Sequence, residues 1–368
     1  MVLLLAGMRW PLGGISFTAL VAQVFLSVGG PGALRVLSAA QQPGLLSPGI
    51  PVTAEAFDSA TAIVVLSAGT LVIADPRARQ VYIVNPATGV RQVIGRQGDG
   101  PGEYRAPVSV HRLRGDTIAI YDVALRRFAL FDRNGRAAGS LSPPRGLFFA
   151  KPIGSDTVGA GSLYFILRLP AGRPPVVPDS GQLVRWRLKG QVDTLALLRF
   201  AASVSTTRRV GERVDVILRT NAFAFSDFPL VGLNGTIAVL RGDPYRVDQV
   251  RPGGTVLGPA IEYESLRVTT ADLEEFRLRR DGEYPWTRKG PLLEGTARME
   301  GDSVIWGARH GPANRATIAW DRLTVAGVRT DSHDLPAFYR IAGFAPSGTI
   351  YVWRRDIDDL QWLERLPR

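Results

Sequence analysis

Apolar and polar residues alternate along most of the chain, in short runs that end at glycine, proline or aspartate. Residues 69–89 read GTLVIADPRARQVYIVNPATG, and residues 115–135 read GDTIAIYDVALRRFALFDRNG. Each segment holds a turn glycine, a run rich in β-branched and aromatic residues that ends in aspartate, a short loop and a second such run. This alternation with a period of two predicts strands rather than helices.

The same plan recurs at a spacing that is typical of propeller blades. Gly69 and Gly115, which open the two segments, are 46 residues apart, and repeats of about 40–50 residues with short strands form the blades of β-propellers. Weaker copies begin at Gly154, Asn234, Gly301 and Ser347. Together the six units predict an all-β fold, a six-bladed β-propeller.

Three insertions make the repeat uneven, and they cover residues 168–182, 199–221 and 262–290. The third contains RVTTADLEEFRLRR, in which acidic residues precede arginines. This order of charges suits the dipole of a helix, and Thr270 is a suitable N-cap. We therefore expect one short surface helix near residues 270–280.

The segment at residues 94–110, IGRQGDGPGEYRAPVSV, interrupts the strands with four glycines and two prolines. In a propeller the chain must return from the outermost strand of one blade to the innermost strand of the next, and sharp turns at glycine and proline allow this. We interpret the segment as the crossover between blades 1 and 2. Its predicted structural residues are Gly100, Pro101, Gly102, Glu103 and Tyr104, with Glu103 accepting main-chain N–H bonds.

Residues 94–135 resemble the NHL-repeat family of β-propellers. The similarity lies in Gly-Pro-Gly-Glu-Tyr, the strand ending in Asp122, Arg127-Phe128 and FDRNG. The segment is also similar to poorly characterised bacterial six-bladed propellers that carry Gly-Pro-Gly-Glu-aromatic at this crossover. The resemblance is specific over residues 69–141, and it implies that Asp122 and Arg127 stabilise a loop. Later units differ, because Arg241 and Arg354 stand in place of the aspartate that ends the strand.

The last unit lacks one strand, and the N-terminal part of the chain has a segment to supply it. Strands are expected near residues 337–345, 349–353 and 360–364, after which the chain ends. Residues 50–57, PVTAEAF with the preceding isoleucine, are expected to provide the outer strand of this blade. Such pairing closes the ring and leaves no free edge between the first and last blades.

The N-terminal segment has the character of an export signal. No charged residue occurs from Trp10 to Val28, and residues 14–28 are largely apolar, as in a signal peptide or a short anchor. We expect residues 1–40 to be a signal peptide or N-terminal anchor and residues 41–368 to form the propeller, in the periplasm or outside the cell. An uncleaved segment, the alternative, would make the protein a membrane-held sensor domain.

The amino-acid composition excludes several kinds of site and favours one kind of partner. The chain has no cysteine, which removes disulfides, cysteine-ligated metals and thiol nucleophiles. Its formal net charge of +11 favours an anionic small molecule or an anionic protein surface as partner. No dense basic run is interleaved with aromatic residues, so we expect no nucleic acid, and we expect membrane contact only through the N-terminal segment.

The sequence assigns no catalytic residue. It has no Gly-x-Ser-x-Gly, no His-Glu-x-x-His and no phosphate-binding loop, and its three histidines, His111, His310 and His333, are not at ligand spacing. We identify no cofactor and no metal ligand. The alternative is a hydrolase or lyase of the propeller type that holds a divalent cation at the central channel, and it requires three or more converging carboxylate, asparagine or histidine side chains.

One face of a propeller gathers the loops between second and third strands together with the crossovers. Residues at these loops are Asp75, Asp122, Arg241, Arg309 and Arg354. Guanidinium groups bind carboxylate or phosphate in a bidentate manner, so we expect the three arginines to bind an anionic or zwitterionic ligand; for the two aspartates a structural role in their loops is the alternative. The leading hypothesis is an exported, non-catalytic propeller that binds a ligand or a protein.

Overall fold

The computed structural model of the chain divides into two units, residues 1–40 and residues 41–368, and the residues that it describes all belong to the second. The described residues are 44–45, 49–60, 62–169, 178–188, 190–201, 203–210, 213–220, 222–276 and 287–367. The predicted signal peptide or anchor lies outside them. Within the described part, the helices are all too short or too polar to cross a membrane.

Six sheets, each built on four antiparallel strands, form the blades of the second unit, so the predicted six-bladed propeller is confirmed. Their strands are, in blade 1, β3 (Ala62–Val65), β4 (Leu71–Asp75), β5 (Gln80–Val84) and β6 (Arg91–Val93); in blade 2, β9 (Pro107–Leu113), β10 (Thr117–Asp122), β11 (Arg127–Phe131) and β12 (Ala137–Leu141); in blade 3, β13 (Lys151–Asp156), β14 (Ser162–Leu167), β15 (Ser180–Arg187) and β16 (Val192–Arg199); in blade 4, β19 (Phe228–Val231), β20 (Ile237–Gly242), β21 (Tyr245–Arg251) and β22 (Gly254–Val256); in blade 5, β23 (Arg298–Glu300), β24 (Val304–Ala308), β25 (Thr317–Thr324) and β26 (Arg329–Pro336); and in blade 6, β27 (Tyr339–Phe344), β28 (Ile350–Arg355), β29 (Gln361–Arg365) and β2 (Ile50–Pro51).

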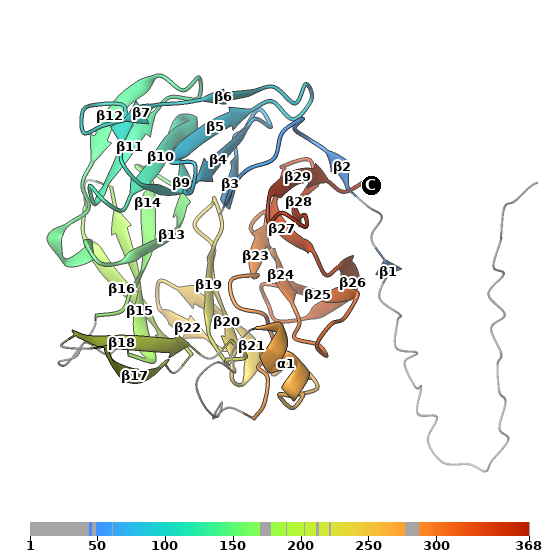
Figure 1. Ribbon diagram of the computed structural model, residues 1–368. Helices are drawn as coiled ribbons and strands as arrows, with labels where there is room; N and C mark the ends of the chain where they lie inside the picture. The colour runs from blue at the N-terminus through green and yellow to red at the C-terminus, as the bar shows by residue number, and fades with distance from the viewer. Residues whose placement is uncertain are drawn as a thin grey trace, which may run out of the picture. The chain divides into compact units, whose positions relative to one another are not determined.

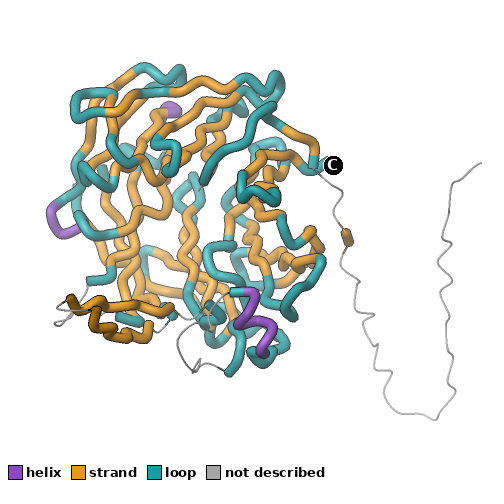
Figure 2. The backbone as a smooth tube through the Cα atoms, in the orientation of Figure 1, coloured by secondary structure: helices purple, strands orange, loops and turns teal. Residues whose placement is uncertain are grey.

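The first strands of the blades surround the axis of the ring. Each packs beside the first strand of the next blade, in the order β3, β9, β13, β19, β23 and β27, and β27 packs back against β3. Figure 1 shows the sheets arranged in this circular order, and Figure 2 shows that strands make up nearly all of its regular structure. The start of every first strand therefore lies near the mouth of the central channel.

The N-terminal segment closes the ring as predicted. β2 pairs antiparallel with β29, and this pairing extends beyond the strand because Phe57 forms a bridge with Gln361. The main-chain N–H of Val52 also donates to the carbonyl of Leu363 at 2.8 Å. A further short strand, β1 (Gly44–Leu45), pairs parallel with β26 and adds a fifth strand to blade 5.

Apolar side chains fill every junction between neighbouring blades. The described residues form six buried clusters, one at each junction. Residues that represent them, from the junction of blades 6 and 1 onward, are Phe57, Phe131, Phe165, Val239, Ile305 and Trp320. Alternation along each strand sends successive side chains to opposite faces, so each sheet contributes to the two junctions beside it.

The glycine-rich segment at residues 94–110 lies between β6 and β9. Two short parallel strands, β7 (Arg96–Gln97) and β8 (Glu103–Tyr104), run within it. Glu103 accepts the main-chain N–H of Gly100 at 2.7 Å, and the buried hydroxyl of Tyr104 donates to the carbonyl of Ile94 at 2.7 Å. Gly102 has φ of 73°, and a Cβ there would lie 2.7 Å from that of Ala137. Pro101 sits in the turn between these contacts.

The insertions add a hairpin and a helix. β17 (Ser203–Val210) and β18 (Arg213–Thr220) form the hairpin, and α1 (Thr270–Glu275) is the expected helix. Its N-cap is Thr269 and not Thr270, because Asp272 stands three residues after Thr269 and the two complete a reciprocal capping box. The arginines expected at the end of the helix, residues 277–280, lie outside the described residues.

Candidate functional site

The two aspartates of the predicted site bind main-chain groups. Asp75 accepts from the N–H groups of Asp58 and Ser59 at 2.8 and 3.0 Å. Asp122 accepts from the N–H groups of residues 105–106 at 2.6 and 3.2 Å. In both blades the carboxylate thus joins the end of the second strand to the incoming crossover. Both side chains are buried, and these contacts support the alternative of a structural role.

The three arginines of the predicted site are each paired with a carboxylate on the third strand of their own blade. The nitrogen–oxygen distances are 2.8 Å for Arg241–Asp248, 3.2 Å for Arg309–Asp321 and 2.5 Å for Arg354–Glu364. All three acidic partners are buried. Burial raises the pKa of Asp321, although Arg309 and Arg329 face it and lower the pKa. The role of these arginines in ligand binding stays a prediction, and much of their hydrogen-bonding capacity is used within the fold.

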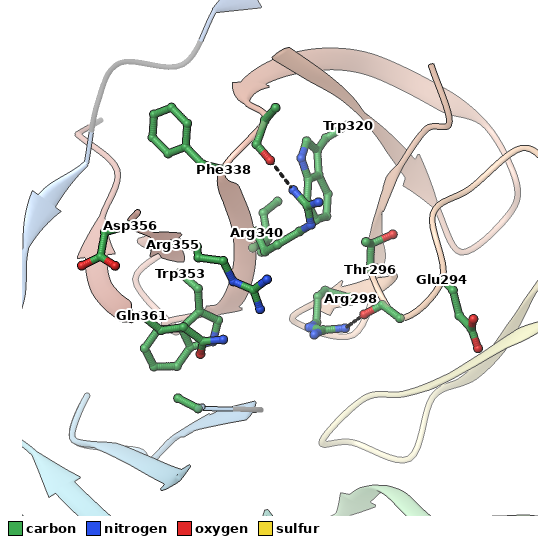
Figure 3. Close-up of a pocket in the computed structure, with 14 residues that line it drawn as sticks. Glu294, Thr296, Arg298, Trp320, Phe338, Arg340, Trp353, Arg355, Asp356 and Gln361 are labelled. Carbon is green, nitrogen blue, oxygen red and sulfur yellow. Dashed lines mark hydrogen bonds between the residues drawn. The ribbon is translucent and has the colours of Figure 1, made fainter. Parts of the chain in front are cut away.

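A cavity of about 490 Å³ lies on the same face, over blades 5 and 6. It is lined by the segment before β23, by the starts of β23 and β27, by the end of β28 and by Ala60 just before β3. Because three of these elements begin first strands, the cavity lies at the mouth of the central channel. Figure 3 shows Arg298, Arg340 and Arg355 among the residues that line the cavity, with the guanidinium group of Arg340 beside Trp320.

Arg298 and Arg340 occupy equivalent places in blades 5 and 6. Across the first two strands Arg298 pairs with Trp306, and Arg340 pairs with Trp353. Nη1 of each arginine donates to the carbonyls three residues and one residue before it. The acceptors are Gly295 and Ala297, at 2.8 and 2.9 Å, for Arg298, and Ala337 and Tyr339, both at 2.8 Å, for Arg340. These bonds hold both side chains across the start of their strands.

The charges of Arg298 and Arg340 are not compensated by a close acid. No carboxylate of the described residues lies within ion-pair distance of either guanidinium. Burial lowers the pKa of both arginines, and the charges of Arg315 and Arg355 lower that of Arg340 further. A guanidinium nevertheless stays protonated at neutral pH. By surface area Arg298 is half-buried and Arg340 is exposed, and the carboxylates of Glu294 and Asp356 also line the cavity, so its lining holds the guanidinium groups of Arg298, Arg340 and Arg355 against two acids.

Three further polar atoms of this cavity lack a partner. The indole nitrogens of Trp320 and Trp353 and the side-chain oxygen of Gln361 are buried and find no hydrogen-bond partner among the described residues. Buried polar groups in native proteins nearly always have one. These atoms are enclosed by the fold, so the donors that a ligand in the cavity can reach are the further N–H groups of the Arg298 and Arg340 guanidinium groups, which suit a ligand with acceptor oxygens.

The arginines of this cavity were not predicted from the sequence, because the predicted site was drawn from residues at the ends of second strands. Arg354 and Arg355 show the reason: successive residues of a strand face opposite sides, so Arg354 points to Glu364 while Arg355 lines the cavity. Arg298 and Arg340 share a position, since both stand at the start of a first strand, β23 and β27.

The histidines show no metal site. Among the residues that the structure describes, no three histidine, aspartate or glutamate side chains lie close enough to hold a metal ion. His111 is buried against the ring of Phe128 and its Nε2 lies 2.9 Å from the hydroxyl of Ser109. His310 lines a second cavity of about 420 Å³, and His333 lies 3.2 Å from Asp331.

Acidification is expected to destabilise the protein through His111. Burial lowers its pKa to about 4, whereas the unfolded chain takes up this proton near pH 6.5. Between these values only the unfolded state is protonated, so stability falls as pH falls, by about 1.4 kcal/mol per pH unit for this residue. Urea unfolding of the wild type and His111→Gln at pH 7 to 4.5 measures it: the variant should lose stability less steeply. Equal slopes would contradict the prediction.

Comparisons with known proteins agree with the fold. No protein family matches the chain, and no curated protein sequence does. Among solved structures, a member of the DUF4221 family from Bacteroides vulgatus is 8% identical with a TM-score of 0.52, over 88% of this chain and 96% of that one. The calcium-binding protein regucalcin from Agrobacterium tumefaciens is 13% identical with a TM-score of 0.46, over 88% and 96%. Virginiamycin B lyase from Staphylococcus aureus is 11% identical with a TM-score of 0.42, over 87% of each chain. At such identities the similarity to the DUF4221 protein shows the propeller fold alone.

Proposed function

We propose that the protein is an exported, non-catalytic β-propeller that binds an organic anion in the cavity at the mouth of its central channel. The observation that carries the proposal is the pair of equivalent arginines, Arg298 and Arg340, which line one cavity and have no carboxylate of the described residues within ion-pair distance. The cavity volume of about 490 Å³ is in the range of pockets that hold small organic ligands. Export is supported by the apolar N-terminal segment of the sequence.

The donors around the cavity favour a ligand with clustered acceptor oxygens. Arg298 and Arg340 keep free N–H groups besides the Nη1 that binds the main chain. Arg355 adds a third guanidinium, and its own acid, Asp359, is 3.7 Å away and exposed. Carboxylate is the simplest group that accepts from two or three such donors at once.

Substitution of either equivalent arginine is expected to weaken anion binding. Arg298→Gln and Arg340→Gln each remove a charged donor worth about 1.5–3 kcal/mol, which corresponds to roughly a 10- to 150-fold loss of affinity. Isothermal titration calorimetry with hexanoate and benzoate measures the effect. Arg114→Gln is the matched control, since Arg114 also donates to a carbonyl, that of Gly159, but lies in the turn between first and second strands.

Two outcomes separate this proposal from its alternatives. If both anions bind the arginine variants as tightly as the wild type, the cavity is not the site. If Arg241, Arg309 and Arg354 variants that remain folded lose binding instead, the site is the one inferred from the sequence. The alternative, a hydrolase or lyase with a divalent cation, stays a prediction. The described residues contain no group of three histidine, aspartate or glutamate side chains that could hold a metal ion. The NHL type of the repeat also stays a prediction.

A further inference from the structure

The cavity has an apolar lining as well as a charged one. Its apolar residues lie among the guanidinium groups, since the carbonyl of Ala337 accepts from Arg340 at 2.8 Å, and they are Ala60, Ala337, Phe338, Ile341 and the tryptophans. Phe338 is 51% exposed, whereas Ile341 and Ala60 are buried. Figure 3 shows Phe338 at the edge of the cavity, on the side away from Glu294.

Phe338 is held in place by its neighbours. Its ring contacts that of the buried Tyr339 with a centroid distance of 5.0 Å. Its carbonyl accepts the main-chain N–H of Arg355 at 3.1 Å. The same edge of blade 6 therefore presents an exposed aromatic ring and a guanidinium group. An aromatic side chain with half of its surface in water gains free energy when an apolar group of a ligand covers it.

We infer that the ligand of this cavity is an amphipathic carboxylate, with its charged group at Arg298 and Arg340 and an aliphatic or aromatic part that extends along Ile341 to Phe338. The inference rests on the proposed function, since it assigns a ligand class to the same site. A hydrated inorganic anion would satisfy the guanidinium groups but would leave the apolar walls and Phe338 in contact with water. An apolar ligand without a charge would cover the guanidinium groups of Arg298 and Arg340 without offering them an acceptor.

The test is a series of alkyl carboxylates that differ only in chain length. Acetate, butyrate, hexanoate and octanoate are titrated into the full chain by calorimetry, with inorganic phosphate as the comparison. Burial of each added methylene is expected to raise affinity by up to about fourfold, and octanoate should bind far more tightly than phosphate. Equal affinities across the series, or phosphate binding as tightly as octanoate, would overturn the inference.

The variant Phe338→Ala tests where the apolar part of the ligand lies. Phe338→Ala should flatten the rise between hexanoate and octanoate and leave acetate unchanged, because only the longer chains reach the ring. Phe149→Ala is the control, since Phe149 is an exposed phenylalanine, 69% accessible, in the crossover before β13. A rise that Phe338→Ala leaves intact would contradict the placement of the chain.

Failure of the inference and failure of the proposed function give different results. If no carboxylate binds, or if binding does not depend on Arg298 and Arg340, both are wrong. If the arginine variants weaken binding but affinity does not depend on chain length, the anion site stands and the ligand is not amphipathic.

Discussion

Replacement of Phe57 by alanine is expected to lower the free energy of unfolding by about 3–5 kcal/mol, as for other buried aromatic residues cut back to alanine. Phe57 is 1% exposed and packs edge-on against Tyr82 of blade 1 and Trp353 of blade 6, with both centroid distances 5.5 Å. It follows β2 in the strand segment that completes blade 6. The side chain of Phe57 thus packs between the first and last blades and contributes to the closure of the ring.

Urea unfolding of the purified full chain measures this effect, and Phe149→Ala is its matched control. Phe149 is 69% exposed and the centroid of its ring lies 4.5 Å from the guanidinium carbon of Arg126; an exposed cation–π contact is worth only about 0.5–1 kcal/mol. A loss for Phe57→Ala no larger than that of the control would mean that residues 50–57 do not close the ring. The order of blades around the axis would then have to be reconsidered.

Removal of the Lys289 charge is expected to have a comparable effect. Lys289 and Asp272 are 1% and 2% exposed, and the ammonium donates to the carboxylate at 2.5 Å and to the carbonyl of Gly311 at 2.6 Å. Loss of one partner of a buried pair leaves the other charge without compensation and costs about 3–5 kcal/mol. Lys289→Met should therefore destabilise the protein by this amount in urea unfolding, while Lys151→Met, at an exposed lysine, should not.

A second substitution tests the cause of this loss. Burial opposes the ionisation of Asp272, but Lys289 and Thr269 outweigh it and hold its pKa below the ordinary value. Without the lysine, the carboxylate is the costly group, so Asp272→Asn in the Lys289→Met background should restore part of the stability and keep an oxygen for the helix cap. If the double variant is as unstable as or less stable than Lys289→Met, the lost cation–π contact of the ammonium with the Phe223 ring, 5.5 Å from its centroid, and not the unpaired carboxylate, accounts for the effect.

The strand repeat was predictable because its signals are local. Six blades could be predicted from the alternation of apolar and polar residues, the turn glycines and the spacing of the units. The strand missing from the last unit indicated that residues 50–57 close the ring. The glycine-rich crossover was predictable for the same reason, since its turns depend on residues within a few positions of one another. The N-cap of α1 was placed one residue late because two adjacent threonines both suit the position, and only Asp272 distinguishes them.

The site was harder to predict because charge compensation is not local. Arg241 and Arg354 stand where other units have aspartate, which suggested a ligand, yet Asp248 and Glu364 on the next strand neutralise them. Arg298 and Arg340 were not singled out from the sequence, and neither has a carboxylate within ion-pair distance among the described residues.

By itself the sequence determined the strands, the number of blades, the means of ring closure and the positive charge of the chain, because each follows from residue type and short-range pattern. Only the tertiary structure decided which guanidinium groups are neutralised inside the fold and which line a cavity. That distinction depends on carboxylates brought near by neighbouring strands and on which side of a strand each arginine faces, and a shift of one residue reverses it.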